Sequence, residues 1–267
     1  MLRVTAISQH ISWENANENF AIVESVLNQL DSVGDLIVLP ECFSTGFSMN
    51  RAVCQTIESA QKEGGSLHFL KSIAKKYNAA FLASILVQEG DNFYNRAYFV
   101  LPNGSFFCYN KRHLFSIADE SKIFTPGTQE LIVNYKGFNI CINVCYDIRF
   151  PVWSRNTSLK YDVLINIANF PKGRIAVVEP LVKARAIENI SYVLFCNRDG
   201  KDESLSYSPS SLSADYKGNL NYNERFLLDC KGNSTQVITC EYNKESLLEF
   251  REKFPVWRDF DNFTVCK

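Results

Sequence analysis

The chain has 267 residues, 46% of them hydrophobic, and a formal net charge of −1. This near-neutral balance gives no global field that would attract nucleic acid or an anionic membrane, and no apolar stretch is long enough to span a bilayer. A chain of this length can bury a large core, and no linker, internal repeat or low-complexity run divides it. We therefore expect a single domain over residues 1–267, without nucleic-acid or membrane partners.

The cysteines and histidines argue against a metal site and against a disulfide framework. The nine cysteines are an odd number at irregular spacing, no Cys-x-x-Cys occurs, and there are three histidines. Cys141 and Cys145 would be about 13 Å apart in an extended strand, too far for a disulfide. The N-terminus lacks a charged region followed by a long apolar core, so we expect no signal peptide. These features predict reduced thiols, no metal, no cofactor and a cytoplasmic location.

The first half of the chain alternates between helix-like and strand-like patterns. Apolar residues at helical spacing predict helices over residues 17–32 and 66–77, the first of them ended by Gly34. Asn103-Gly104 separates two apolar runs and predicts a hairpin, because this pair readily adopts the positive φ of a tight turn. The predicted strands cover residues 2–8, 35–39, 79–87, 93–101 and 106–109.

The second half continues this alternation. Helices are predicted just after Pro151, over residues 175–189 and over residues 243–253. Turns are predicted at Lys217-Gly218-Asn219 and Lys231-Gly232-Asn233. Alternating helices and strands with several hairpins indicate an α/β protein with two mixed sheets and outer helices. The predicted strands cover residues 131–135, 138–144, 161–167, 192–197, 207–215, 220–228 and 236–242.

Three reactive side chains each follow directly after an apolar strand. They are Glu41, Lys111 and Cys145. In open α/β sheets, ligands bind at the carboxyl ends of the strands, so we expect these side chains to converge on one pocket. Cys145 is then a candidate nucleophile. The alternative is a small buried packing residue, which is the ordinary role of a free cysteine.

These strand ends belong to segments that resemble the signature motifs of the nitrilase (carbon–nitrogen hydrolase) superfamily. Their order and spacing match as well, and the resemblance covers nearly the whole chain. It implies a four-layer αββα sandwich of two mixed β-sheets with outer helices, a homodimer, and catalytic roles for Glu41, Lys111 and Cys145. The segments are Pro40-Glu41, Asn110-Lys111-Arg112-His113-Leu114-Phe115, Cys145-Tyr146-Asp147-Ile148-Arg149-Phe150-Pro151, Ile167-Ala168-Asn169-Phe170-Pro171 and Ala184-Arg185-Ala186-Ile187-Glu188-Asn189.

The chemistry of these residue types suits attack on an amide. An ordinary thiol is only a few per cent thiolate at neutral pH, so Cys145 needs a base or a nearby cation. A desolvated Glu41 would accept the thiol proton. Lys111 and the backbone N–H of Tyr146 would stabilise the negative charge that develops on the substrate oxygen. Glu120 resembles an additional active-site glutamate of the family, which would orient Lys111 or pass a proton to the leaving group. The alternative for Glu120 is an exposed loop acid.

Other polar residues in these segments compete for roles. Cys42, beside Glu41, is a rival nucleophile, but we expect it to pack in the loop because the family pattern tolerates varied residues there. His113 would allow a Cys–His dyad, although the segment around it fits the family without a catalytic histidine. We expect Asp147 and Arg149 to form an ion pair that shapes the turn after the nucleophile.

Two further segments, residues 149–156 and 251–257, resemble the bacterial omega-amidase branch of the family. The resemblance implies that the chain hydrolyses the terminal amide of small 2-oxo acids such as 2-oxoglutaramate and 2-oxosuccinamate. In this reaction the cysteine forms a thioester with the substrate, and ammonia is released. Such a substrate needs a cation for its carboxylate, and Arg174 is the candidate. The expected lining of a small pocket is Phe115, Tyr146 and Phe170.

The chain also departs from that branch at two places. A His-Trp pair common there is Val177-Val178 here, and a glycine common in a later Tyr-x-Gly-x-Ser pattern is Pro209. We expect both departures to reshape the rim of the pocket. The alternative functions are a carbamoyl-amide hydrolase or a nitrilase of the same superfamily, or a non-enzymatic binding protein with this fold. The presence together of Glu41, Lys111 and Cys145 argues against the last of these.

Overall fold

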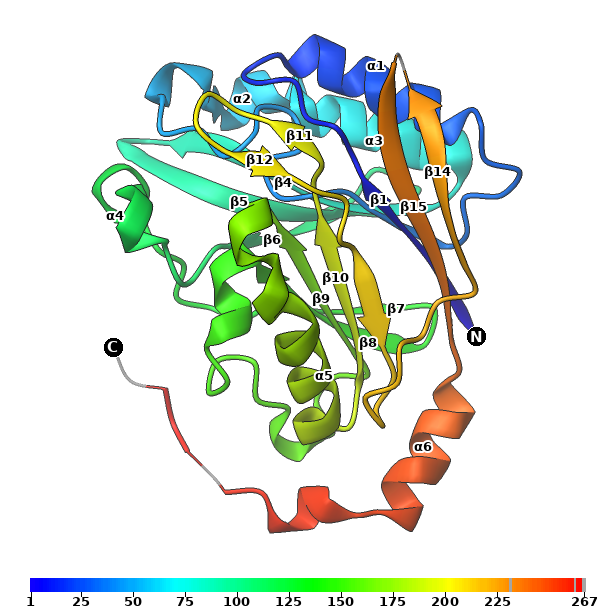
Figure 1. Cartoon of the computed structure of the whole chain (residues 1–267). Coiled ribbons are helices and arrows are strands. Elements are labelled where there is room, and N and C mark those ends of the chain that lie inside the picture. Colours follow the sequence, from blue (N-terminus) through cyan, green and yellow to red (C-terminus); the bar gives the residue numbers. More distant parts are fainter. Residues whose placement is uncertain (231, 262, 266–267) are drawn as a thin grey trace.

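The larger of two stacked sheets contains both the first and the last strand of the chain. The computed structural model describes residues 1–230, 232–261 and 263–265. In this part of the chain the larger sheet has the order β14-β15-β1-β2-β4-β5-β6, with β3 paired to β4 (Figure 1). Its strands are β1 (Leu2–Ser8), β2 (Leu36–Val38), β3 (Gln55–Thr56), β4 (Ala80–Glu89), β5 (Asn92–Val100), β6 (Phe106–Asn110), β14 (Glu224–Cys230) and β15 (Asn233–Tyr242).

The smaller sheet carries the nucleophile segment. It has the order β13-β10-β9-β8-β7, and its three inner strands run parallel to one another. A short separate ribbon pairs β11 with β12. The strands are β7 (Ile132–Tyr135), β8 (Phe138–Val144), β9 (Val163–Ala168), β10 (Tyr192–Asn197), β11 (Gly200–Lys201), β12 (Ser206–Tyr207) and β13 (Leu212–Ala214).

Helices cover the outer face of each sheet. Buried side chains of α1 and α3 pack on one face of the larger sheet, and those of α5 pack on the smaller sheet, while a third cluster fills the space between the sheets. Figure 1 shows α1 and α3 on the side of the larger sheet and α5 in front of the smaller one. The predicted four-layer αββα sandwich is therefore confirmed. The helices are α1 (Ala16–Leu27), α2 (Ile57–Gln61), α3 (Ser66–Tyr77), α4 (Glu120–Ile123), α5 (Val178–Asn189) and α6 (Lys244–Lys253).

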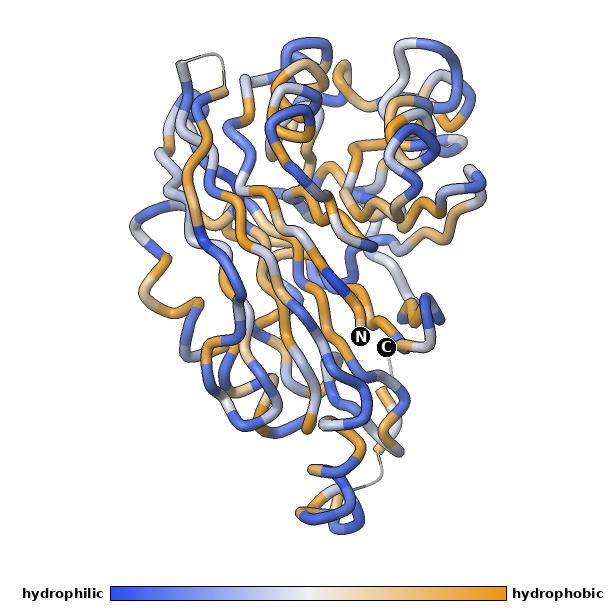
Figure 2. The backbone as a smooth tube through the Cα atoms, turned by 90° about the vertical axis from the view of Figure 1, so that its right-hand side faces the viewer, coloured by the Kyte–Doolittle hydropathy of each residue, from blue (hydrophilic) through white to orange (hydrophobic). Residues whose placement is uncertain are grey.

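Strand β9 shows why the central strands read as continuous apolar runs. Val163, Ile165 and Ile167 point into the core between the sheets, whereas Leu164 and Ala168 point toward α5. Because both faces are covered, the strand is apolar except for the buried Asn166 and lacks the polar alternation of a half-exposed one. Figure 2 shows these hydrophobic strands running through the centre of the molecule.

The structure differs from the predicted elements where side chains replace backbone hydrogen bonds. In the segment after Pro151, where a helix is predicted, only a short 3₁₀ helix forms, Thr157–Leu159. Instead, Asn156 donates to the carbonyls of Tyr161 and Asn189 and accepts from the Tyr161 N–H, so the segment follows these partners. The strand predicted over residues 207–215 is interrupted near Pro209, which has no N–H for a ladder.

Other boundaries shift by a few residues. The first helix ends at Leu27, earlier than predicted, and the strand predicted from residue 220 begins at Glu224. Gly34 has a φ of +76°, which explains why a glycine stands in this turn. Lys231 of the predicted Lys231-Gly232-Asn233 turn lies outside the described residues. Within the described ranges, no helix is long and apolar enough to cross a membrane, and no group of three or more His, Cys, Asp or Glu side chains is placed to hold a metal.

Candidate active site

The ends of β2, β6 and β8 bring Glu41, Lys111 and Cys145 into one cluster. Lys111 Nζ donates to Glu41 Oε1 at 2.8 Å and to Glu120 Oε2 at 2.9 Å. Glu120 is the first residue of the short helix α4, and it is fully buried rather than an exposed loop acid. The cluster therefore contains one ammonium group between two carboxylates.

Burial makes the electrostatics of this cluster strong. The side chains of Lys111, Glu41 and Glu120 have no exposed surface. Burial acts to lower the pKa of Lys111, but the charges of Glu120 and Glu41 outweigh it and hold that pKa well above its usual value. Burial raises the pKa of Glu120, an effect that Lys111 opposes and Glu41 reinforces. Lys111 therefore remains an ammonium group throughout the physiological pH range.

The carboxylate oxygens of Glu41 and Glu120 have further donors that fix their orientation. Asn95 Nδ2 donates to Glu41 Oε1 at 2.7 Å, and the backbone N–H of Asn169 donates to Glu41 Oε2 at 2.9 Å. The backbone N–H of Phe115 donates to Glu120 Oε2 at 2.5 Å. Each carboxylate is thus held from more than one side, which a preorganised site requires.

Cys145 sits at a strained position directly after β8. Its φ is +49°, in the left-handed region that non-glycine residues rarely adopt, and it opens a 3₁₀ turn over Cys145–Arg149. Asp147 holds this turn, because its carboxylate accepts from the Val144 N–H, the Tyr109 hydroxyl and the His113 N–H. The expected Asp147–Arg149 ion pair is therefore wrong, since these donors occupy Asp147.

The Cys145 thiol has a pKa well above its usual value. Burial is the main cause and the negative charge of Glu41 adds to it, whereas Lys111 and the Asn169 backbone N–H oppose them. At neutral pH the resting sulfur is consequently a thiol next to a carboxylate rather than a thiolate. A nucleophile of this kind needs its proton removed by a base at the moment of attack.

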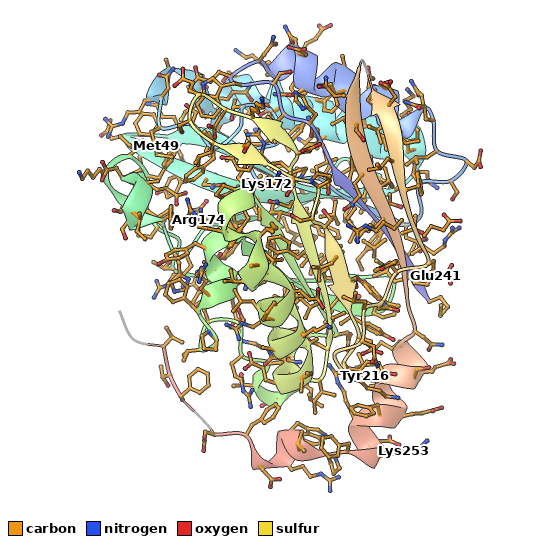
Figure 3. The ribbon with its side chains drawn as sticks, viewed as in Figure 1. Met49, Lys172, Arg174, Tyr216, Glu241 and Lys253 are labelled. Atoms are coloured by element: carbon orange, nitrogen blue, oxygen red, sulfur yellow. The ribbon has the colours of Figure 1, made fainter. Side chains whose placement is uncertain are left out.

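A cavity of about 380 Å³ opens beside Cys145. The four residues that the sequence suggests for substrate binding, Tyr146, Arg174, Phe115 and Phe170, all line it. Figure 3 labels Arg174 and Met49, two lining residues that lie on the same side of the molecule. The other lining residues include Trp13, Glu14, Glu41, Ser48, Arg149, Asn169, Asp202, Glu203 and Tyr207.

Two guanidinium groups face this cavity. Arg174 lies over the ring of Phe115, 4.6 Å from its centroid, and Arg149 lies 5.8 Å from the centroid of Phe170. Neither arginine forms an ion pair with a carboxylate in the part of the chain that the structure describes. The sequence identified Arg174 but gave Arg149 only a structural role, because its neighbour Asp147 looked like its natural partner.

Cys42 and His113, the alternative candidates for catalytic roles, do not line the cavity. Cys42 is fully buried against Ser84 and does not line the cavity. His113 pairs with Asp147 and stacks on Phe150, and it is also absent from the cavity wall. The eight cysteines within the described ranges are free.

The two departures from the branch pattern are next to the cavity wall but are not part of it. Val178, the first residue of α5, packs in the core with Val177 against it, and neither lines the cavity. Pro209 lines a second cleft together with Lys172 and Lys201. Their effect on the rim stays a prediction, because Val177 shares a 3₁₀ turn with the lining residue Arg174 and Pro209 lies two residues after the lining residue Tyr207.

Comparison with known proteins identifies the family. A model of the carbon–nitrogen hydrolase family matches residues 3–254. An omega-amidase, YafV of Yersinia enterocolitica, is 35% identical over 265 residues, which cover 99% of this chain and 98% of the relative. The 2-oxoglutaramate amidase of Bacillus subtilis is 30% identical over 260 residues, with 96% of each chain covered.

A solved structure agrees with the sequence relatives. The crystal structure of XC1258 from Xanthomonas campestris, a CN-hydrolase superfamily protein with an arsenic adduct in the active site, superposes with a TM-score of 0.89. Its sequence is 29% identical, and the superposition covers 99% of both chains. The family that the sequence motifs predicted is confirmed, and this chain belongs to the carbon–nitrogen hydrolase family.

Proposed function

We propose that this protein is an omega-amidase that hydrolyses the terminal amide of short 2-oxo dicarboxylic acid monoamides, such as 2-oxoglutaramate and 2-oxosuccinamate. The observation that carries the proposal is the cavity beside Cys145, which has a buried Glu41–Lys111–Glu120 cluster on one side and two guanidinium groups on its wall. A short substrate with an amide at one end and a carboxylate at the other fits this cavity, with the amide beside the catalytic cluster and the carboxylate beside a guanidinium group. The activities of the two sequence relatives, omega-amidase and 2-oxoglutaramate amidase, support the same substrate class.

The reaction begins with transfer of the Cys145 thiol proton to Glu41. The thiolate formed in this way attacks the amide carbon, and negative charge develops on the amide oxygen. The ammonium group of Lys111 and the backbone N–H of Tyr146 stabilise that charge. The Tyr146 N–H suits this role because it lies in the first turn of a short helix, where backbone donors have no intrahelical partner.

The second half of the reaction releases ammonia and then the acid. Glu41 returns its proton to the leaving nitrogen, the carbon–nitrogen bond breaks, and a thioester remains on Cys145. A water molecule then gives a proton to Glu41 and attacks the thioester. The carbon–sulfur bond breaks, the carboxylic acid leaves, and Glu41 returns the proton to the Cys145 sulfur. Glu120 holds Lys111 in place throughout, because both of its oxygens accept from Nζ.

The substrate carboxylate pairs with Arg174. A charge-assisted hydrogen bond contributes about 1.5–3 kcal/mol, which corresponds to roughly ten- to hundredfold discrimination against an uncharged analogue. Phe115, Tyr146 and Phe170 limit the length of the chain that fits between this cation and Cys145.

Ammonia release across a panel of substrates tests the proposal. We expect higher kcat/KM for 2-oxosuccinamate or 2-oxoglutaramate than for propionamide, carbamoyl-β-alanine or a matching nitrile. Arg174→Ala should remove most of the preference over propionamide, roughly ten- to hundredfold. Lys172→Ala is the matched control, because Lys172 is an exposed cation in the same 3₁₀ turn but lines only the second cleft. A better rate with carbamoyl-β-alanine or a nitrile would contradict the assignment.

The oligomeric state has its own test. We propose that the chain acts as one catalytic domain in a homodimer, in the cytoplasm, without a metal or cofactor, on the basis of family membership. Light scattering at micromolar concentration should give twice the mass of the chain. A mass equal to a single chain at that concentration would overturn the dimer but not the catalytic assignments.

A further inference from the structure

Arg198 is a fully buried cation next to the active site that the mechanism above does not use. It follows β10 directly and has no exposed surface. Among the described residues it is the largest fully buried side chain. Burying a charge without a counter-ion is costly. No carboxylate forms an ion pair with it among residues 1–230, 232–261 and 263–265. Asp202 is near, but its oxygens accept from the Ser204 and Leu205 N–H groups and the Tyr207 hydroxyl.

The guanidinium group instead joins separate segments around the cavity. Its Nη2 donates to the carbonyl of Ile11 at 2.7 Å and to that of Lys201 at 3.2 Å, and its Nε donates to the carbonyl of Asp199 at 3.0 Å. It lies over the ring of Tyr207, 4.3 Å from the centroid. Its donors thus hold the β11–β12 ribbon, whose connecting loop forms part of the cavity wall.

The remaining guanidinium nitrogen, Nη1, faces Asn169, which in turn binds the catalytic carboxylate. Arg198 Nη1 lies 3.5 Å from Asn169 Oδ1, a long contact in which the positive charge faces the amide oxygen. The Asn169 amide nitrogen donates to the carbonyl of Glu41 at 2.5 Å and lies 3.5 Å from Glu41 Oε2. The Asn169 backbone N–H also donates to Oε2, while Lys111 and Asn95 occupy Oε1.

The loop after Glu41 is packed against the same guanidinium. Gly46 has a φ of +78°, and a Cβ there would lie 3.2 Å from Arg198 Nη1 and 3.0 Å from the Trp13 ring. A larger residue would push the arginine away from Asn169. The glycine therefore lets the loop backbone lie close to the guanidinium group.

We propose that Arg198 is a positioning residue for Glu41, which acts through Asn169 to orient the carboxylate and to favour its ionised form. This inference rests on the proposed function of Glu41 as the base. A positive charge at the amide oxygen strengthens the amide N–H as a donor, and the donor then holds the side of the carboxylate that Lys111 does not reach. The titratable groups that face the guanidinium are His10, Cys42, Asp199, Asp202 and Tyr207, and Glu41 lies beyond Asn169.

Kinetics of Arg198→Met as a function of pH test the proposal. We expect kcat to fall roughly 10- to 100-fold, because a small displacement of a catalytic group is costly. The acidic limb of the pH–rate profile should move to higher pH, because the lost positive charge makes the ionised carboxylate less favourable. Arg198→Lys keeps the charge but loses the fork of donors, so it should recover part of the rate and show a smaller shift. If Arg198→Met does not fold, Arg198→Lys decides: a reduced kcat with a small shift of the acidic limb to higher pH supports the proposal, and wild-type kcat with an unmoved limb overturns it.

A double variant of Arg198 and Asn169 distinguishes a positioning role of Arg198 from a general effect on protein stability. If the arginine acts through Asn169, adding Arg198→Met to Asn169→Ala should reduce kcat by less than about threefold. Arg251→Met is the matched control: Arg251 is also buried but binds Asp162 and the Tyr161 carbonyl at the opposite end of β9. It should lower stability without moving the pH profile. Multiplicative losses in the double variant, or an unchanged acidic limb in Arg198→Met, would overturn the proposal.

Alkylation of Cys145 gives a readout that needs no substrate. The pH profile of modification by iodoacetamide, with the site assigned by peptide mass, should move to higher pH in Arg198→Met, because Glu41 takes the thiol proton and its ionised form loses the support of Arg198. An unchanged alkylation profile would contradict the role of Arg198 even if the wild-type protein hydrolyses none of the amides tested. If none of the amides is hydrolysed but the alkylation profile of Arg198→Met is shifted, the proposed substrate class is rejected and the positioning role of Arg198 is retained.

Discussion

Replacing Cys145 with alanine is expected to lower ammonia release from 2-oxosuccinamate by at least about 10⁴-fold, because no other cysteine among the described residues lines the cavity to form the thioester. The protein should still fold, since the substitution removes one sulfur atom at the edge of a cavity and leaves the bonds of Asp147 that hold the turn. Steady-state kinetics with circular dichroism measure both outcomes.

Cys42→Ala is the control for this experiment. Cys42 is buried against Ser84, and burial raises the pKa of its thiol well above the usual value. It does not line the cavity, so the Cys42→Ala variant should keep most of the wild-type rate. Substantial activity in Cys145→Ala, or complete loss in Cys42→Ala, would reverse the assignment of the nucleophile.

Replacing Lys111 with methionine is expected to damage both catalysis and stability. The two carboxylates of Glu41 and Glu120 would face each other in a buried site without their cation, which costs about 3–5 kcal/mol of unfolding free energy. Turnover should fall severely because the developing oxyanion also loses its counter-charge. Kinetics and urea unfolding measure the two effects separately.

The stability loss in Lys111→Met should depend on pH with a defined sign. Burial already raises the pKa of Glu120 above its unfolded value, and removing Lys111 removes the main opposing effect. A group with a raised folded pKa stabilises the fold below its unfolded pKa, and this contribution is lost as the pH rises through the folded pKa. The variant should therefore be closest to wild type near pH 4 and progressively less stable toward pH 8.

Two further variants complete this test. Lys160→Met removes a partly exposed lysine paired with Glu130 and should change stability by less than about 1 kcal/mol. Glu41→Gln combined with Lys111→Met should reduce turnover little beyond the more severe single variant, because groups that act as a unit are not additive. Independent, multiplicative losses would show that the two residues do not act together.

The sequence predicts the catalytic cluster because strand ends are visible in it. Glu41, Lys111 and Cys145 each follow an apolar run, and the carboxyl ends of such strands meet at one edge. Asn169 follows β9 in the same way, so the rule that found the others would have found it too. Asn95 lies inside β5, where nothing in the local pattern marks an inward-facing polar side chain as part of the site.

Features that depend on partners distant in the sequence could not be predicted. Asp147 binds Tyr109 and His113, which lie more than 30 residues away, so its neighbour Arg149 remains free to face the cavity. The segment after Pro151 has helix-compatible residues, but Asn156 binds the distant carbonyl of Asn189 instead. The sandwich itself follows from family resemblance, because alternating strands and helices are compatible with several α/β arrangements.

Intact-protein mass spectrometry during turnover tests the central assignment most directly. Enzyme that is quenched with acid while it hydrolyses 2-oxosuccinamate should carry an adduct equal to the substrate minus ammonia, and peptide mapping should place it on Cys145. The adduct should be absent from Cys145→Ala. Steady ammonia release with no adduct, or with the adduct on Cys42, would contradict a thioester at Cys145.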